Sequence, residues 1–355
     1  MNMFSVNLNN QFAFLNFIIP NQKKMKKILK WFAVIVLVLV TVYLAGPRPS
    51  KPDFNINLPD LPVTLTDLEN QINLSEKATK GLKPDNEARI IWADTAKKEK
   101  TKIAFLYLHG FTGSFAEGEP VHRDLAKKYN ANLYLARLSE HGIDRGDSTL
   151  INLTAESYES SAERAYQIAK QLGDEVIVFG TSAGGALSIF LASRYPEIKA
   201  LVLWAPCIRL YDGAASILNK PWGLQLGRLF SGGPMKSFKA ENPIHANYWT
   251  LNFRVEGLVA LVNLYSNTMK PEVFSKVKCP VFLGYYYKSE TEQDMTVSVP
   301  AMLKMYDELG TPPELKQKTA FPGAEAHVIA SSIRSKDWKG VERETDKFLR
   351  EIVKL

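Results

Sequence analysis

One stretch near the middle of the chain limits the fold more than any other. An apolar run over Glu175–Phe179 leads into Gly180-Thr181-Ser182-Ala183-Gly184-Gly185, which opens a segment rich in Ala and Leu. A Gly-x-Ser-x-Gly between a strand and a helix is typical of a turn too sharp for side chains, which pushes the serine outward at the amino end of the helix. The alternative is a glycine-rich packing turn with a passive serine.

Short β-branched or aromatic runs alternate with longer amphipathic stretches from residue 88 onward. This alternation predicts an α/β fold, in which helices cover a mostly parallel sheet. The expected strands are Ala88–Ala93, Ile103–His109, Asn132–Arg137, Glu175–Phe179, Ala200–Trp204, Val281–Tyr287 and Gln317–Phe321. The expected helices are Gly118–Tyr129, Ala155–Gln171, Ala183–Tyr195, Pro300–Leu309 and Asp337–Val353.

The alternation stops over residues 208–277, where helical stretches rich in Trp, Leu, Gly and Asn contain no clear strand. We expect a helical insertion that caps the carboxyl ends of the strands, because ligands bind there in open α/β sheets.

A serine hydroxyl needs a neighbouring base that takes its proton, and in chains with this serine turn the acid and then the histidine follow the serine. Two of the five histidines, His245 and His327, come after Ser182. His245 falls inside the insertion, whereas His327 lies in a glycine-containing loop between the last expected strand and the last expected helix. We predict that His327 is the base; the alternative is an exposed loop histidine.

The acid is expected in the loop after Val281–Tyr287, which offers Glu290, Glu292 and Asp294. We choose Asp294 because it directly precedes the apolar run into the next helix, where packing can fix its backbone. Glu290 is the second candidate, and each carboxylate could instead be a solvated loop residue.

The negative oxygen formed during acyl transfer needs hydrogen-bond donors. The N–H of Ala183 follows the nucleophile, and the loop after the strand Ile103–His109 supplies Phe111 as the second expected donor. His109 is then expected to shape the turn.

Several of these motifs together resemble one family. Leu-His-Gly-Phe-Thr-Gly at 108–113, Arg-Leu-Ser-Glu-His-Gly at 137–142, the serine turn and the late Asp294 and His327 resemble α/β-hydrolases, most nearly the carboxylesterase and monoacylglycerol lipase branch. The resemblance covers about residues 85–355 and implies an eight-stranded sheet, a cap, no cofactor, and ester hydrolysis through an acyl-enzyme. The loop between Gly284 and Asp294 is longer than such enzymes usually have.

The basic charge of the chain is confined to its beginning. Residues 1–51 contain seven Lys or Arg and no acid, which equals the net charge of +7, so the remainder is neutral and no nucleic-acid partner is expected. Two cysteines without zinc-type spacing give no indication of a metal site.

An uncharged apolar run over residues 31–45 follows this basic cluster, as in a membrane anchor whose body is exported. A cleaved signal peptide is the alternative, although Tyr43 occupies the −3 position of the expected cleavage site. We expect a non-native or disordered leader over 1–24, a signal anchor over 25–46, a tether and lead-in over 47–84, and the hydrolase domain over 85–355 with its cap at 208–277.

The expected function is therefore hydrolysis of a small, partly apolar ester by an enzyme anchored in a bacterial-type cell envelope outside the cytoplasm, or secreted after signal cleavage. Two alternatives remain: an amide or peptide hydrolase of the same fold, and a non-catalytic envelope binding protein.

Overall fold

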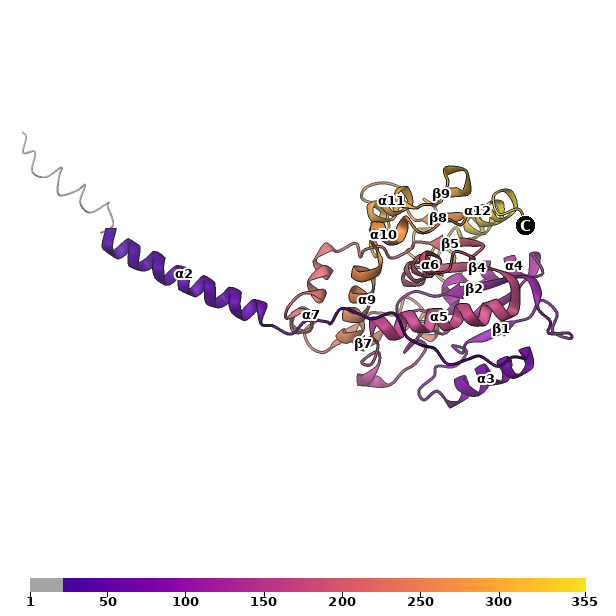
Figure 1. Cartoon of the computed structure of the whole chain (residues 1–355), viewed down its shortest axis with the longest axis horizontal. Coiled ribbons are helices and arrows are strands. Elements are labelled where there is room, and N and C mark those ends of the chain that lie inside the picture. The colour runs from indigo at the N-terminus through magenta and orange to yellow at the C-terminus, as the bar shows by residue number, and fades with distance from the viewer. Residues whose placement is uncertain (1–21) are drawn as a thin grey trace, which may run out of the picture. The chain divides into compact units, whose positions relative to one another are not determined.

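The computed structural model describes residues 22–355, so most of the predicted leader over 1–24 lies outside the described residues (Figure 1). The chain divides into two units, Met1–Arg48 and Pro49–Leu355. In the first unit the helix α2 (Gln22–Leu44) is apolar, and 22 of its residues, Lys23–Leu44, are long and hydrophobic enough to cross a membrane. The expected apolar amino-terminal helix is therefore present.

The second unit is built on a mostly parallel sheet covered by helices (Figure 1). Within residues 22–355 this sheet has seven strands in the order β1-β3-β2-β4-β5-β8-β9, and only the pairing of β1 with β3 is antiparallel. The strands are β1 (Arg89–Ile91), β2 (Thr101–Leu108), β3 (Asn132–Leu135), β4 (Gly173–Thr181), β5 (Ala200–Trp204), β8 (Val281–Tyr285) and β9 (Lys316–Ala320).

All seven strands expected from the apolar runs are present, but the eighth strand implied by the family resemblance is not found among the described residues. The chain before β1 forms the helix α3 (Leu65–Ala78) instead of a strand. The side chain of Thr64 caps this helix by accepting the N–H of Asp67, and Leu68 and Ile72 are buried in the core.

Successive side chains of a strand point to opposite faces of the sheet, so the central strands contribute to two separate cores, one on each face. In β2, Leu106 belongs to the core under α5 (Ala155–Leu172) and α6 (Ala183–Arg194), whereas Tyr107 belongs to the core under α4 (Val121–Lys128) and α12 (Trp338–Glu351). Burial on both faces explains why these strands read as continuous apolar runs. The helix α11 (Val299–Glu308) packs on the first core.

The insertion over residues 208–277 is mainly helical, as expected. It also contains a two-stranded antiparallel sheet of β6 and β7, which the sequence did not predict because each strand has only three residues. Its elements are a 3-10 helix (Gly213–Asn219), α7 (Gly223–Phe230), β6 (Met235–Ser237), α8 (Pro243–Tyr248), β7 (Asn252–Arg254), α9 (Val255–Thr268) and α10 (Pro271–Phe274).

The predicted tether is extended, but from Pro49 onward it lies against the body. The Phe54 ring contacts the Phe190 ring of α6 edge-on, with centroids 5.1 Å apart. The backbone oxygen of Phe54 accepts a hydrogen bond from Arg194, and that of Ser50 accepts one from Asn263 of α9. Residues 49–62 therefore form part of the folded unit.

Candidate active site

Ser182 lies at the turn between β4 and α6, with φ of 53° and ψ of −118°. This conformation is costly for a residue with a side chain and persists only where the surroundings enforce it. A Cβ on Gly184 would lie 2.0 Å from the backbone oxygen of Leu108, and one on Gly180 would lie 2.6 Å from the oxygen of Gly184. Gly184 is therefore required because the turn packs directly against the end of β2, and Gly180 because the start of α6 folds back onto it.

Asp294 and His327 are brought together from loops that follow β8 and β9. The Asp294 Oδ2 atom lies 2.5 Å from Nδ1 of His327, and Oδ1 accepts the N–H groups of Thr296 and Val297 at 2.8 and 3.0 Å. The Asp294 side chain is fully buried. Both carboxylate oxygens are thus used, and the His327 ring is held with Nδ1 toward the acid.

The unusual length of the loop before Asp294 has a local explanation. Tyr287 pairs with Gln293 in an antiparallel bridge, and the N–H of Asp294 donates to the oxygen of Tyr286 at 3.2 Å. The intervening residues form a hairpin that returns the chain to the end of β8. The alternative acid, Glu290, is exposed in this hairpin and accepts from the Tyr287 hydroxyl.

Burial opposes protonation of His327, but the negative charge of Asp294 and its hydrogen bond outweigh this effect, and the pKa of His327 is raised above its usual value. The Nε2 atom of His327 is buried and has no hydrogen-bond partner among residues 22–355. The hydrogen bond from Ser182 to His327 expected of a catalytic triad is therefore not formed in this structure. Such contacts often tighten only when substrate binds.

The loop over residues 110–113, which we call the oxyanion loop because it contains the expected oxyanion donor Phe111, lies directly against Ser182. A Cβ on Gly110 would lie 2.9 Å from Cβ of Ser182, so the expected donor Phe111 follows a residue in contact with the serine. Ala183 is the first residue of α6, so its N–H has no intrahelical acceptor. Both expected donors thus belong to backbone segments next to Ser182.

Two other histidines near the sequence motifs have distinct environments. His109 is buried, with Nδ1 at 2.8 Å from the oxygen of Gly110 and Nε2 accepting the N–H of Leu138, and burial lowers its pKa to about 4. Its bonds fix the start of the oxyanion loop. His245, on α8, lies 2.8 Å from the Arg334 guanidinium, and burial together with this charge lowers its pKa.

One residue next to the site, Glu117, was not identified from the sequence. The carboxylate of Glu117, in the short 3-10 helix Phe115–Gly118, accepts the N–H of Gly110 and, at 3.2 Å, the indole N–H of Trp249 from the insertion. Glu117 is 2% exposed. In the sequence Glu117 is an acidic residue a few positions after the glycine loop. Its position alone does not distinguish a buried carboxylate from a solvated one.

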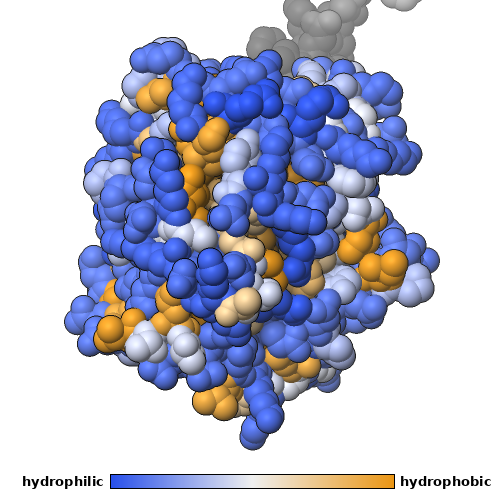
Figure 2. Space-filling model, turned by 90° about the vertical axis from the view of Figure 1, so that its right-hand side faces the viewer, coloured by the Kyte–Doolittle hydropathy of each residue, from blue (hydrophilic) through white to orange (hydrophobic). Residues whose placement is uncertain are grey.

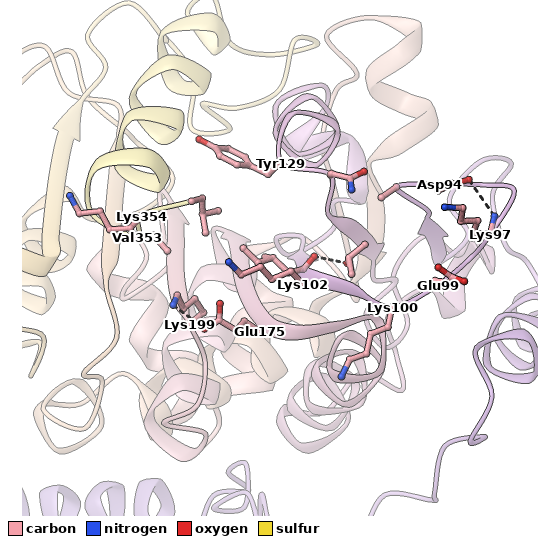
Figure 3. A pocket seen from close by; sticks show the side chains of 15 residues that line it. Asp94, Lys97, Glu99, Lys100, Lys102, Tyr129, Glu175, Lys199, Val353 and Lys354 are labelled. Carbon is pink, nitrogen blue, oxygen red and sulfur yellow. Dashed lines mark hydrogen bonds and ion pairs between the residues drawn. The ribbon is translucent and has the colours of Figure 1, made fainter.

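The cavity drawn in Figure 3 lies elsewhere, at the amino-terminal ends of the central strands. It has a volume of about 570 Å³, and Ile103 of β2, Glu175 of β4 and Leu355 line it, whereas Ser182, Asp294 and His327 do not. Lys199 and Glu175, which lie side by side in its lining, form an ion pair at 2.9 Å. Ligands of open α/β sheets bind at the opposite, carboxyl ends of the strands, so this cavity is separate from the candidate catalytic site.

The face shown in Figure 2 is mainly hydrophilic, with apolar side chains in separate patches. Among residues 22–355 there is no group of three or more His, Cys, Asp or Glu side chains that could hold a metal ion. Cys207 and Cys279 are free thiols.

The strand order, the serine turn after β4 and the histidine loop after β9 define an α/β-hydrolase fold. Residues 103–232 match the family model for this fold. The chain is 32% identical over 104 residues to the thermostable monoacylglycerol lipase of Bacillus sp. (strain H-257). That match covers 29% of this chain and 40% of the curated relative, so it spans about two fifths of the relative's length.

Solved structures of lipolytic enzymes have the same fold. A structure from the metagenome-derived lipolytic enzymes LipS and LipT superimposes with a TM-score of 0.60 and 18% identity, covering 76% of this chain and 99% of the other. A soluble variant of monoglyceride lipase from Saccharomyces cerevisiae, bound to a substrate analogue, gives 0.54 and 14%, covering 86% and 98%. The chain thus has the α/β-hydrolase fold and is similar, over part of its length, to a monoacylglycerol lipase.

Proposed function

We propose that this protein is a serine hydrolase that cleaves carboxylic esters, with Ser182 as nucleophile, His327 as general base and Asp294 as the acid that orients the base. The observation that carries the proposal is the buried Asp294–His327 hydrogen bond, formed in a chain whose only Gly-x-Ser-x-Gly adopts the strained turn of a nucleophile. Similarity to monoacylglycerol lipases supports an ester as the substrate.

The proposed reaction proceeds in two halves. The Ser182 oxygen attacks the ester carbonyl while Nε2 of His327 takes the hydroxyl proton, and the N–H groups of Phe111 and Ala183 bind the resulting oxyanion. The C–O bond then breaks, and His327 returns its proton to the departing alcohol. Water attacks the acyl-enzyme and gives one proton to His327; the carboxylic acid leaves, and Ser182 regains its hydrogen.

Asp294 contributes by its position. Its Oδ2 atom keeps the His327 proton on Nδ1, which leaves Nε2 as the acceptor, and its negative charge stabilises the imidazolium that forms during the attack. Its second oxygen is held by two backbone N–H groups, so the acid cannot turn away from the ring.

The insertion over 208–277 is proposed as the cap over the substrate site. It supplies Trp249 and Phe253, both buried, near the oxyanion loop: the Phe253 and Phe111 rings have centroids 5.3 Å apart. An apolar surrounding of this kind favours a partly apolar acyl or alcohol group, and the neutral body gives no preference for a charged ester.

Labelling with a fluorophosphonate tests the nucleophile directly, because the reagent forms a covalent bond with an activated serine. We expect labelling of the wild-type protein and none of Ser182→Ala. A panel of acyl esters and matched amides then tests the substrate class. Absence of labelling in correctly folded wild-type protein would indicate a binding protein, and faster turnover of amides than of esters would contradict the ester assignment.

We propose further that α2 anchors the protein in a cell-envelope membrane and that the body lies outside the cytoplasm. The support is an apolar span of 22 residues, with lysines at its amino end. Mass spectrometry of the mature amino terminus in the membrane and soluble fractions tests this. An intact α2 in the membrane fraction is expected, whereas a soluble form that lacks residues before about 46 would show cleavage and secretion.

A further inference from the structure

Glu117 is a buried carboxylate beside the candidate nucleophile, and the proposed reaction gives it no role. It is 2% exposed, and one oxygen accepts the Gly110 N–H while the other accepts the Trp249 indole N–H at 3.2 Å. Burying a charged group costs free energy unless it is well paired. A carboxylate exposed to water would avoid this cost, so the burial of Glu117 needs an explanation.

The carboxylate fills the inner side of the oxyanion loop. A Cβ on Gly113 would lie 2.1 Å from Oε1 of Glu117, and a Cβ on Gly110 would lie 2.9 Å from both Oε2 of Glu117 and Cβ of Ser182. The acid therefore occupies the space under the loop from its first residue to its last. The backbone between these glycines includes Phe111, whose N–H is the proposed oxyanion donor.

The same carboxylate joins this loop to the insertion. The Trp249 ring is 6% exposed and packs with Ala116 and Val328, the neighbours of Glu117 and His327. A second bond runs in parallel, from the N–H of Thr250 to the oxygen of Thr112 at 2.7 Å. Two consecutive residues of the insertion thus hold the loop, Thr250 by a direct hydrogen bond and Trp249 through Glu117.

We propose that Glu117 is a positioning residue that, in its ionised form, holds the oxyanion loop against Trp249 and so directs the Phe111 N–H at the reacting carbonyl. The inference rests on the proposed function. A carboxylate can accept both N–H groups, whereas a protonated acid or an amide retains only part of that acceptor capacity. Turnover therefore requires an ionised Glu117 as well as a neutral His327.

The ionisation of Glu117 falls near neutral pH. Burial raises its pKa to about 7, against the Gly110 hydrogen bond and the nearby charge of His327, which lower it. Arg334 also faces the carboxylate and lowers its pKa, and the hydroxyls of Tyr107 and Tyr158 are within its electrostatic reach. Both Glu117 and His327 must therefore lose a proton before the enzyme is active.

The test compares Glu117→Gln with wild type on a short-chain ester from pH 5 to pH 9. We expect kcat to fall about ten- to a hundredfold while KM changes little, since the change weakens the placing of an oxyanion donor without removing it. The acid limb of the wild-type kcat/KM profile should approach a slope of two in logarithmic form, and that of the variant a slope of one. Equal kcat values and equal slopes would overturn the proposal.

The matched control is Glu119→Gln, the same chemical change two residues away. The Glu119 carboxylate pairs with Arg123 at 2.7 Å, and among the hydrogen bonds and ion pairs of residues 22–355 it has none with the oxyanion loop. We expect wild-type kcat and a wild-type slope. If Glu119→Gln changed both as much as Glu117→Gln does, the effect would reflect general disturbance of the segment, and the specific role of Glu117 would be rejected.

Trp249→Phe tests the insertion side of the contact, because phenylalanine keeps a packed ring and removes the indole N–H. Loss of this donor should move the acid limb to higher pH, as the hydrogen bond favours the ionised acid. If Trp249 had a purely packing role, the acid limb would stay in place.

An inactive wild-type protein would refute the proposed function itself. An active wild type, together with a Glu117→Gln variant of unchanged kcat and slope, would refute only this inference.

Discussion

The Asp294 carboxylate bridges two parts of the site: one oxygen lies 2.5 Å from Nδ1 of His327, and the other accepts two backbone N–H groups from Thr296 and Val297. An amide has one oxygen and one NH₂ group, so at this position it could not accept both from His327 and from the two backbone N–H groups. Asp294→Asn should therefore present the wrong face or tautomer of the imidazole and lower kcat/KM by about 10³- to 10⁴-fold. Steady-state kinetics on an ester measure this loss.

Glu290→Gln is the matched control for Asp294→Asn, because Glu290 lies in the same loop and is exposed, and among the hydrogen bonds of the described residues its carboxylate accepts only the Tyr287 hydroxyl, at 3.1 Å. It should retain wild-type kcat/KM. A large loss in Glu290→Gln with little loss in Asp294→Asn would reverse the assignment of the acid.

The strands and the serine turn could be predicted from the sequence, because parallel strands buried on both faces give continuous apolar runs and the turn needs glycines at fixed positions. The helix α3 was missed, since its charged surface hides the few side chains that it buries, such as Leu68 and Ile72. The choice between Asp294 and Glu290 depended on a hairpin closed by Tyr287 and Gln293, which spacing alone does not reveal.

Glu117 illustrates the limit of local reasoning in the candidate site. Its burial depends on Trp249, which lies 132 residues later in the chain and belongs to an insertion whose packing has no simple periodicity. The seven strands are specified by short-range pattern, whereas this contact is specified only by the completed fold.

The charge of Arg334 provides a test of the electrostatics around the base. Arg334 lowers the pKa of both His327 and Glu117. Because kcat/KM requires a neutral histidine, activity is lost as the pH falls through the raised pKa of His327, which is above 6.5. Arg334→Gln should raise both pKa values and move the acid limb of the profile to higher pH. Arg343→Gln, a change at an exposed position on α12, should leave the limb unmoved.

The serine turn should tolerate no side chain at Gly184. A Cβ there would lie 2.0 Å from the oxygen of Leu108 and 2.6 Å from that of His109, and these backbone atoms belong to the end of β2 and the residue that follows it. Gly184→Ala should lower the free energy of unfolding by about 3 kcal/mol or more, as severe overpacking does. Urea denaturation measures the change. Gly213→Ala, at a glycine with no atom within 4 Å of the added carbon, should be close to neutral.

The extended segment over 49–62 should lose its attachment when the Phe54 ring is removed. This ring packs on the Phe190 ring, and the guanidinium of Arg194 lies 5.7 Å from the Phe190 centroid. Phe54→Ala should reduce stability by about 1 to 2 kcal/mol and expose the segment to limited proteolysis. Ile56→Ala, at a side chain that is already 41% exposed, serves as the control. Equal protease resistance of both variants would show that Phe54 does not hold the segment.

Glu117 should reduce stability at alkaline pH while it supports activity. Its pKa is raised from 4.5 to about 7 in the folded protein, so the folded state binds its proton more tightly than the unfolded state. Stability from this group is therefore greatest below pH 4.5 and is lost as the pH rises through about 7, with a total of about 3.5 kcal/mol for 2.5 pH units at about 1.4 kcal/mol each. Glutamine cannot ionise and removes this dependence.

The measurement is the free energy of unfolding of Glu117→Gln relative to wild type at pH 5 and at pH 8. The difference should shift in favour of the variant by about 1 to 3 kcal/mol between the two pH values, although the variant is the poorer enzyme. Glu290→Gln, at an exposed carboxylate, should give the same difference at both pH values. A pH-independent difference for Glu117→Gln would mean that the carboxylate has the same proton affinity in the folded and unfolded chains, which its burial beneath the oxyanion loop argues against.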